Sequence, residues 1–191
     1  MDEAPVTEGI LLVKLLILHA PKTAINKALT INGFGGCRYI FGHSRLVTNG
    51  SQLNSDNNQP VVKDNIIGIH NGIIVNSESL WRSNSLLNQI YEIDTEVFFS
   101  LIRLFYNSSK SQLGKAVSKS LNKIDGTIAS AFFLNDLNKF VITTNNGSLY
   151  KIEKENKLLY FASESFILEQ MAKKYKLKKL IGNYNIEQIK P

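Results

Sequence analysis

Cysteine and histidine are scarce in this sequence: one cysteine, Cys37, and three scattered histidines occur among 191 residues. A single thiol cannot build an intramolecular disulfide framework or a cysteine-cluster zinc site, and the histidines form no ligand set. We therefore expect no metal centre and no cofactor. Dependence on disulfides is typical of oxidising compartments, so their absence favours a reducing one, most simply the cytoplasm.

Arginine is also scarce, because only four of the 22 basic residues are arginines. The excess over 16 acidic residues gives a net charge of +6 and is carried by lysine. Lysine excess without arginine or interleaved aromatic residues is weak support for nucleic-acid binding. We expect no nucleic-acid partner and interpret the lysine-rich segment 173–179 as a solvated helix face, with a basic adaptor for nucleic acid or an anionic surface as the minor alternative.

The sequence has no long hydrophobic run and no internal boundary. Its longest apolar stretch, residues 9–20, is interrupted by Lys14 and is shorter than the roughly 20 residues that cross a bilayer. It follows Asp2 and Glu3, not the basic residues that open a secretory signal. No repeat, proline-rich linker or change in composition divides the chain, and 43% hydrophobic residues are ordinary for a globular protein. We predict one domain over residues 1–191, without a membrane partner.

Short apolar runs dominate the chain, and Asn-Gly pairs at 49–50, 71–72 and 146–147 separate several of them. Asn-Gly between apolar runs is a strong hairpin signal, because both residues tolerate positive φ. The runs predict strands at 39–41, 66–70, 73–76, 127–134, 140–144, 148–153 and 158–162. We expect 140–144 and 148–153 to pair as a hairpin and 158–162 to continue the meander.

Helical spacing predicts helices at 78–89, 95–106, 112–123 and 164–174. The clearest is 95–106, where apolar residues form one stripe, namely Val97, Phe98, Leu101, Ile102 and Phe105. Such a stripe packs on a sheet. Strands joined by hairpins, with helices laid on the sheet faces, predict an α+β fold with largely antiparallel sheets.

Three segments place polar side chains beside apolar strand ends: 42–50, 70–73 and 93–97. Taken singly, each has an ordinary explanation, namely a surface ion pair, a hairpin turn and a helix N-cap. Taken together, they contain the groups that hold a free amino acid. The Arg45 guanidinium suits an α-carboxylate and the Asp94 carboxylate an α-ammonium. The side-chain amide of Asn71 and the backbone N–H of Gly72 could donate to a tetrahedral oxyanion.

Six ordered segments resemble the class II glutamine amidotransferase domain of the N-terminal-nucleophile hydrolases: 42–50, 57–60, 70–76, 93–97, 125–126 and 161–165. The resemblance covers roughly residues 38 to 168. It implies a four-layer αββα sandwich of antiparallel sheets. The implied chemistry is hydrolysis of glutamine to glutamate and ammonia through a cysteine thioester, with the ammonia delivered to a synthase domain or partner subunit.

The same resemblance implies roles for individual residues. Arg45 would bind the glutamine carboxylate and Asp94 its α-amino group. Asn71 and Gly72 would form the oxyanion hole. Further residues, Thr48 and Asn49, would line the glutamine pocket.

The nucleophile departs from the family pattern. The family begins with a cysteine whose own α-amino group acts as the base, whereas this sequence begins with Met1. Cys37 is internal, and we interpret it as a small buried hydrophobic residue. We expect the first strand and helix of the family to be absent here and no thioester to form. The chain is then a truncated enzyme or a non-catalytic binding or interaction module, and an unpaired strand edge makes a homo-oligomer possible.

Overall fold

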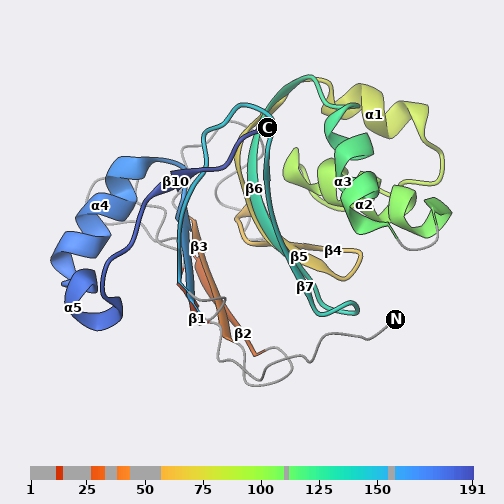
Figure 1. Cartoon of the computed structure of the whole chain (residues 1–191). Helices are drawn as coiled ribbons and strands as arrows, with labels where there is room; N and C mark the ends of the chain where they lie inside the picture. The colour runs from red at the N-terminus through yellow and green to blue at the C-terminus, as the bar shows by residue number, and fades with distance from the viewer. Residues whose placement is uncertain (1–11, 15–26, 33–37, 44–56, 110–111, 155–157) are drawn as a thin grey trace, which may run out of the picture.

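A computed structural model of the chain describes residues 12–14, 27–32, 38–43, 57–109, 112–154 and 158–191. Two β-sheets stack face to face, and each carries helices on its outer face (Figure 1). The first sheet has the order β10 (Glu187–Gln188), β8 (Tyr150–Lys154), β9 (Leu158–Ala162), β1 (Leu12–Lys14), β3 (Arg38–His43) and β2 (Lys27–Asn32). The second has the order β4 (Val61–Lys63), β5 (Ile66–Ile74), β6 (Gly126–Leu134) and β7 (Lys139–Thr144). Neighbouring strands are antiparallel except where β1 pairs with β3 and β9, which confirms the predicted α+β class.

The central strand β6 shows how the sequence builds two cores at once. Its side chains alternate between the faces of the sheet, because successive residues of a strand point to opposite sides. Ile128, Phe132 and Leu134 belong to the core beneath the helices, whereas Ala131 and Phe133 belong to the core between the two sheets. The mostly apolar composition of β6 therefore reflects burial on both faces.

The predicted apolar stripe at 95–106 is confirmed in α2 (Thr95–Ser109). Val97, Phe98 and Ile102 are fully buried against the second sheet. The Phe98 ring meets the Phe132 ring of β6 edge-on, with centroids 6.2 Å apart. Helix α3 (Leu113–Leu121) lies beside α2, and α1 (Ser77–Ser83) completes this helical layer (Figure 1).

Helix α1 ends at Ser83 and not at 89, so the prediction of 78–89 was too long. Asn84 leaves the helix with extended backbone angles, and its side-chain amide donates to the carbonyl of Leu80 at 3.0 Å. This bond satisfies one of the carbonyls that the helix end leaves open. The apolar residues after Asn84 therefore belong to a loop.

The predicted hairpin turn at Asn71-Gly72 is wrong. Residues 66 to 74 form one strand, β5, in nine consecutive pairs with β6. Asn71 faces Ala129 and Gly72 faces Ile128 within this ladder. The pairing partner determines the local structure here, because nine ladder positions outweigh the turn preference of two residues. Gly72 nevertheless keeps a positive φ of 142° inside the strand.

The predicted hairpin between 140–144 and 148–153 is also wrong, because β7 pairs with β6 in the second sheet and β8 pairs with β9 and β10 in the first. The turn between them carries the chain from one sheet to the other. The hydroxyl oxygen of Thr144 accepts the N–H groups of Asn146 and Gly147 at 3.2 and 3.1 Å. These bonds close the turn without requiring the flanking strands to pair. The predicted continuation into 158–162 is confirmed by the antiparallel β8–β9 pair.

The outer face of the first sheet is covered by α4 (Ser165–Lys174), which was predicted, and α5 (Leu177–Ile181), which was not. Lys176 joins them in the left-handed conformation, with φ of 52°. Ile167, Leu168 and Leu177 pack onto β8 and β9. The layers therefore follow the order αββα, as predicted (Figure 1). In the described part of the chain, no helix combines the length and apolar character that a membrane span needs.

Candidate functional site

The candidate site lies where β5 runs past the end of β4. The last pair between these strands is Val61 with Gly68, so β5 continues beyond it without β4 beside it. His70 is buried, whereas the next three residues, Asn71 to Ile73, are exposed. The two residues predicted as oxyanion donors, Asn71 and Gly72, thus lie on an accessible stretch of a central strand.

Asp94 is brought to this stretch from the start of α2. One carboxylate oxygen, Oδ2, accepts the backbone N–H of Ile74 at 2.8 Å. The side chain is largely buried, with 7% exposure. Asp94 directly precedes α2, and its carboxylate bonds to β5. The bonded residue, Ile74, lies two residues along the strand from Gly72. The structure brings together Asp94, Asn71 and Gly72 of the predicted site.

His70 lies behind the exposed stretch with its ring completely enclosed. Nε2 is 3.0 Å from the Thr127 carbonyl oxygen, which can only accept, so Nε2 carries the proton. Nδ1 is 3.2 Å from the Thr95 hydroxyl and accepts its proton in the neutral ring. Burial lowers the pKa of His70, and the Asp94 carboxylate, with Oδ1 4.0 Å from Nδ1, opposes this only in part. The ring is a neutral connector between β5, β6 and α2.

The pKa of His70 lies below the ordinary histidine value of 6.5, which predicts a dependence of stability on pH. Below about pH 6.5 the unfolded chain binds a proton that the folded ring does not, so acid favours unfolding. We expect the free energy of unfolding to fall from pH 6.5 downward, with a slope approaching one proton, until the pH passes the folded pKa. Urea titrations of the wild type and of His70→Gln between pH 5 and 8 measure this.

The difference between the two proteins isolates His70, because the other two histidines are common to both. His70→Gln should be less stable at pH 7.5 and should lose the part of the acid dependence that His70 causes. Parallel curves for the two proteins across this range would contradict a buried neutral ring.

Gly72 and Gly126 allow β5 and β6 to approach closely at the site. A Cβ on Gly72 would lie 2.0 Å from the Thr127 carbonyl oxygen, and a Cβ on Gly126 would lie 2.0 Å from that of Ile73. Both glycines have positive φ, 142° and 137°, which side chains disfavour. The close approach of β5 and β6 therefore requires glycine at both positions, one in the segment 70–76 and one in the segment 125–126.

Gln59 is a site residue for which the sequence predicted no role, although it falls in the segment 57–60. Its side-chain amide donates to the His70 carbonyl at 2.7 Å, and its Oε1 accepts the His70 N–H. The side chain is buried, with 6% exposure. A polar residue directly before Pro60, in a segment that is otherwise rich in amides, was the available signal.

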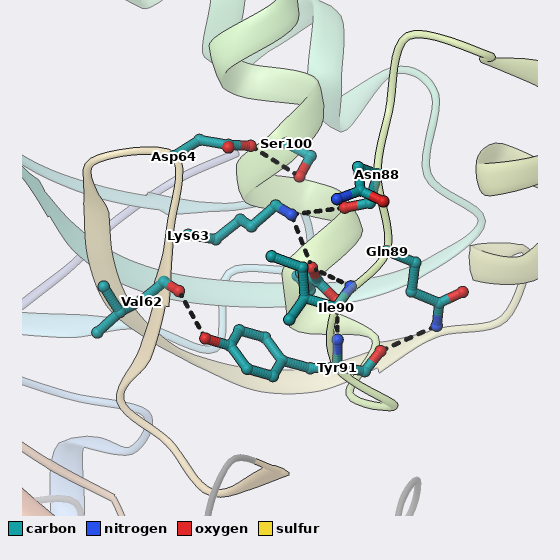
Figure 2. A network of polar contacts seen from close by, with 9 residues as sticks. Val62, Lys63, Asp64, Asn88, Gln89, Ile90, Tyr91 and Ser100 are labelled. Atoms are coloured by element: carbon teal, nitrogen blue, oxygen red, sulfur yellow. Dashed lines mark hydrogen bonds and ion pairs between the residues drawn. The ribbon is translucent and has the colours of Figure 1, made fainter.

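A second unpredicted feature is the buried ion pair of Lys63 and Glu96. The ammonium of Lys63 lies 3.0 Å from Glu96 Oε1, and both side chains are almost completely enclosed. The carboxylate also accepts the backbone N–H groups of Ile90 and Tyr91 at 2.8 and 2.7 Å, while Lys63 donates to the carbonyl of Asn88 at 2.5 Å (Figure 2). The pair therefore ties strand β4 and the loop after α1 to the first turn of α2.

Four predicted residues lie outside the described part of the chain: Arg45, Thr48, Asn49 and Cys37. Their predicted roles remain those that the resemblance implies. The described half of the site comprises the donors on β5, the carboxylate of Asp94 and the polar contacts behind them.

Comparison with known proteins agrees with this architecture. Residues 43–170 match the family model described as a glutamine amidotransferase domain. Glutamine-fructose-6-phosphate aminotransferase (isomerizing) of Buchnera aphidicola subsp. Acyrthosiphon pisum is 28% identical over 135 residues, which are 70% of this chain and 22% of that protein. The protein of the same name from Caldanaerobacter subterraneus subsp. tengcongensis is 32% identical over 98 residues, which are 50% of this chain and 16% of that protein. The chain thus spans a minor part of these relatives.

Solved structures show the same fold. The glutamine phosphoribosylpyrophosphate amidotransferase of B. subtilis, complexed with ADP and GMP, superposes with a TM-score of 0.56 at 21% identity, over 82% of this chain and 32% of that one. A structure titled as the allosteric regulatory enzyme of purine biosynthesis gives the same TM-score at 22% identity, with the same coverage. The fold is that of the N-terminal-nucleophile-type amidotransferases. Together with the family match, these findings establish that this chain belongs to the class II glutamine amidotransferase domain family.

Proposed function

We propose that this domain binds the side chain of L-glutamine at the exposed stretch of β5. One observation carries the proposal: the Asp94 carboxylate reaches across to Ile74, so that a buried negative group and the Asn71-Gly72 pair lie along the same few residues of strand. Free glutamine presents a positive α-ammonium group and a polarised side-chain amide. The site offers a counterpart to each.

The roles follow from the chemistry of each group. Asp94 is an acceptor with an enclosed charge, which suits an ammonium group. Asn71 and Gly72 are the donors for the oxygen of the side-chain amide, whose negative charge grows when a nucleophile attacks its carbon. Arg45, Thr48 and Asn49 hold the carboxylate and the remainder of the substrate in this proposal. No cofactor or metal takes part in it.

Isothermal titration calorimetry with L-glutamine and L-glutamate tests the proposal. Asp94→Asn keeps the shape and an acceptor for Ile74 but removes the charge, so we expect glutamine affinity to fall at least about tenfold, equal to about 1.4 kcal/mol. The matched control is Asp136→Asn, at the opposite end of β6, where the carboxylate pairs with Arg103. Equal affinities in Asp94→Asn and the control would contradict the role of Asp94.

Ammonia release from glutamine by the same preparations separates a glutaminase from a non-catalytic glutamine-binding module. Glutamine binding with ammonia release would identify a glutaminase, whereas binding without release would identify a non-catalytic module. We further propose that any ammonia produced passes to a synthase domain or subunit outside these residues. The named relatives, aminotransferases that are several times longer than the matched region, support this part of the proposal.

A further inference from the structure

The edge of β5 is completed by a side chain where strand β4 stops. The β4–β5 pairs run from Lys63 with Ile66 to Val61 with Gly68. Extending this register by two residues places Gln59 opposite His70. Pro60 lies between Gln59 and β4 and has no N–H to contribute to a ladder. The Gln59 carboxamide, which carries a donor and an acceptor like a peptide group, bonds both backbone groups of His70 in place of a strand.

Alternation along β5 places the Gly72 N–H on this same edge. Odd-numbered residues of β5 and its continuation use their backbone groups toward β6: the Ile69 carbonyl accepts the Ser130 hydroxyl, and the Val75 N–H donates to Asp125. The backbone groups of His70 and Ile74 point to the other edge, toward Gln59 and Asp94. Gly72 has the same parity and falls midway between them.

The two anchored residues therefore bracket the proposed oxyanion donor. Gln59 fixes the peptide group between His70 and Asn71 by donating to the His70 carbonyl, and Asp94 fixes the strand two residues beyond Gly72. Gly72 itself has a φ of 142°, a conformation open to glycine that a regular ladder does not impose. Without an anchor at His70, nothing in the β4 pairing would hold the strand at this point, because that pairing ends at Gly68.

We propose that Gln59 is a positioning residue: it aims the Gly72 N–H at the carboxamide of bound glutamine by holding His70 at both backbone groups. This inference rests on the proposed function and extends it. Gln59 acts through the strand and does not itself touch the substrate. Its effect is therefore confined to the part of the ligand that meets the oxyanion donors.

The test compares two ligands by calorimetry: L-glutamine and L-norvaline, which has a methyl group in place of the carboxamide. Gln59→Met, which removes both hydrogen bonds, should weaken glutamine binding about tenfold and leave norvaline binding unchanged. Gln59→Glu keeps the acceptor for the His70 N–H but loses the donor, and it should give a smaller loss of the same kind. Gln112→Met, at an exposed glutamine before α3, is the matched control.

The outcomes distinguish a positioning role of Gln59 from a general structural role. If the Gln59 variants weaken both ligands equally, Gln59 has a general structural role and the positioning proposal is wrong. If they retain the wild-type preference for glutamine over norvaline, the proposal is likewise overturned, while the proposed function stands. A wild-type chain that binds norvaline as tightly as glutamine, or binds neither, would overturn the proposed function and this inference with it.

Discussion

Replacing Glu96 with alanine is expected to lower the free energy of unfolding by about 3–5 kcal/mol, because it leaves the Lys63 ammonium enclosed without its counter-charge. Both side chains are at most 4% exposed. The substitution also strips the acceptor from the N–H groups of Ile90 and Tyr91. Urea unfolding followed by circular dichroism measures the loss, and Lys63→Met should approach the same magnitude.

The chain contains a matched control for this prediction. Glu78 and Arg82 of α1 form an ion pair of the same length, 3.0 Å, but both side chains are more than 80% exposed. An exposed pair of this kind contributes only about 0.3–0.5 kcal/mol. Glu78→Ala should therefore scarcely change stability. If Glu96→Ala and Glu78→Ala had similar effects, burial would not govern the Lys63–Glu96 pair.

The predicted instability has a consequence for the candidate site, because three consecutive residues at the start of α2 bind two different strands. Asp94 accepts the Ile74 N–H of β5. Thr95 bonds the ring of His70, and Glu96 pairs with Lys63 of β4. Loss of Glu96 releases the first turn of the helix and thereby the carboxylate proposed to bind glutamine. We expect glutamine affinity to fall in Glu96→Ala even under conditions where the chain stays folded.

The parts of the fold that local pattern controls were predictable from the sequence. The stripe on α2 and the double-sided apolar run of β6 follow from helical and strand spacing. The position of Asn71-Gly72 inside a strand was not predictable in this way, because the ladder partner of Asn71, Ala129, lies 58 residues away along the chain. Likewise, the turn at 146–147 gives no local sign that the strands on either side belong to different sheets.

The residues of the candidate site were likewise only partly predictable from the sequence. Asp94 and Gly72 were assigned to one site only when the three polar segments were considered together and through the resemblance. Taken alone, Asp94 suits a helix cap and Gly72 suits a turn. Gln59 could not be assigned, because its role depends on the register of β4 against β5 and on where that pairing ends. The Lys63–Glu96 pair joins residues 33 positions apart, and burial, which sequence spacing does not give, distinguishes it from a surface pair.

Gly72→Ala carries the second large expected effect. The new Cβ would lie 2.0 Å from the Thr127 carbonyl oxygen and 2.8 Å from His70 Nε2. The backbone φ of 142° is itself strained for any residue with a side chain. The overlap involves backbone atoms of a central strand, so it cannot be relieved by a rotamer change. We expect a loss of at least about 3 kcal/mol in the free energy of unfolding, combining backbone strain with overpacking.

The same substitution at Gly114 separates this geometric effect from the general consequence of replacing glycine. Gly114 lies in α3, and a Cβ there would meet nothing within 4 Å. Gly114→Ala should stabilise the chain by up to about 1 kcal/mol, because alanine loses less backbone entropy in a helix. Opposite signs in the two variants would locate the requirement for glycine at the β5–β6 contact. Equal stability of the two variants would contradict the close approach of these strands. Since the His70 ring and the Thr127 carbonyl meet at that contact, Gly72→Ala should also abolish glutamine binding.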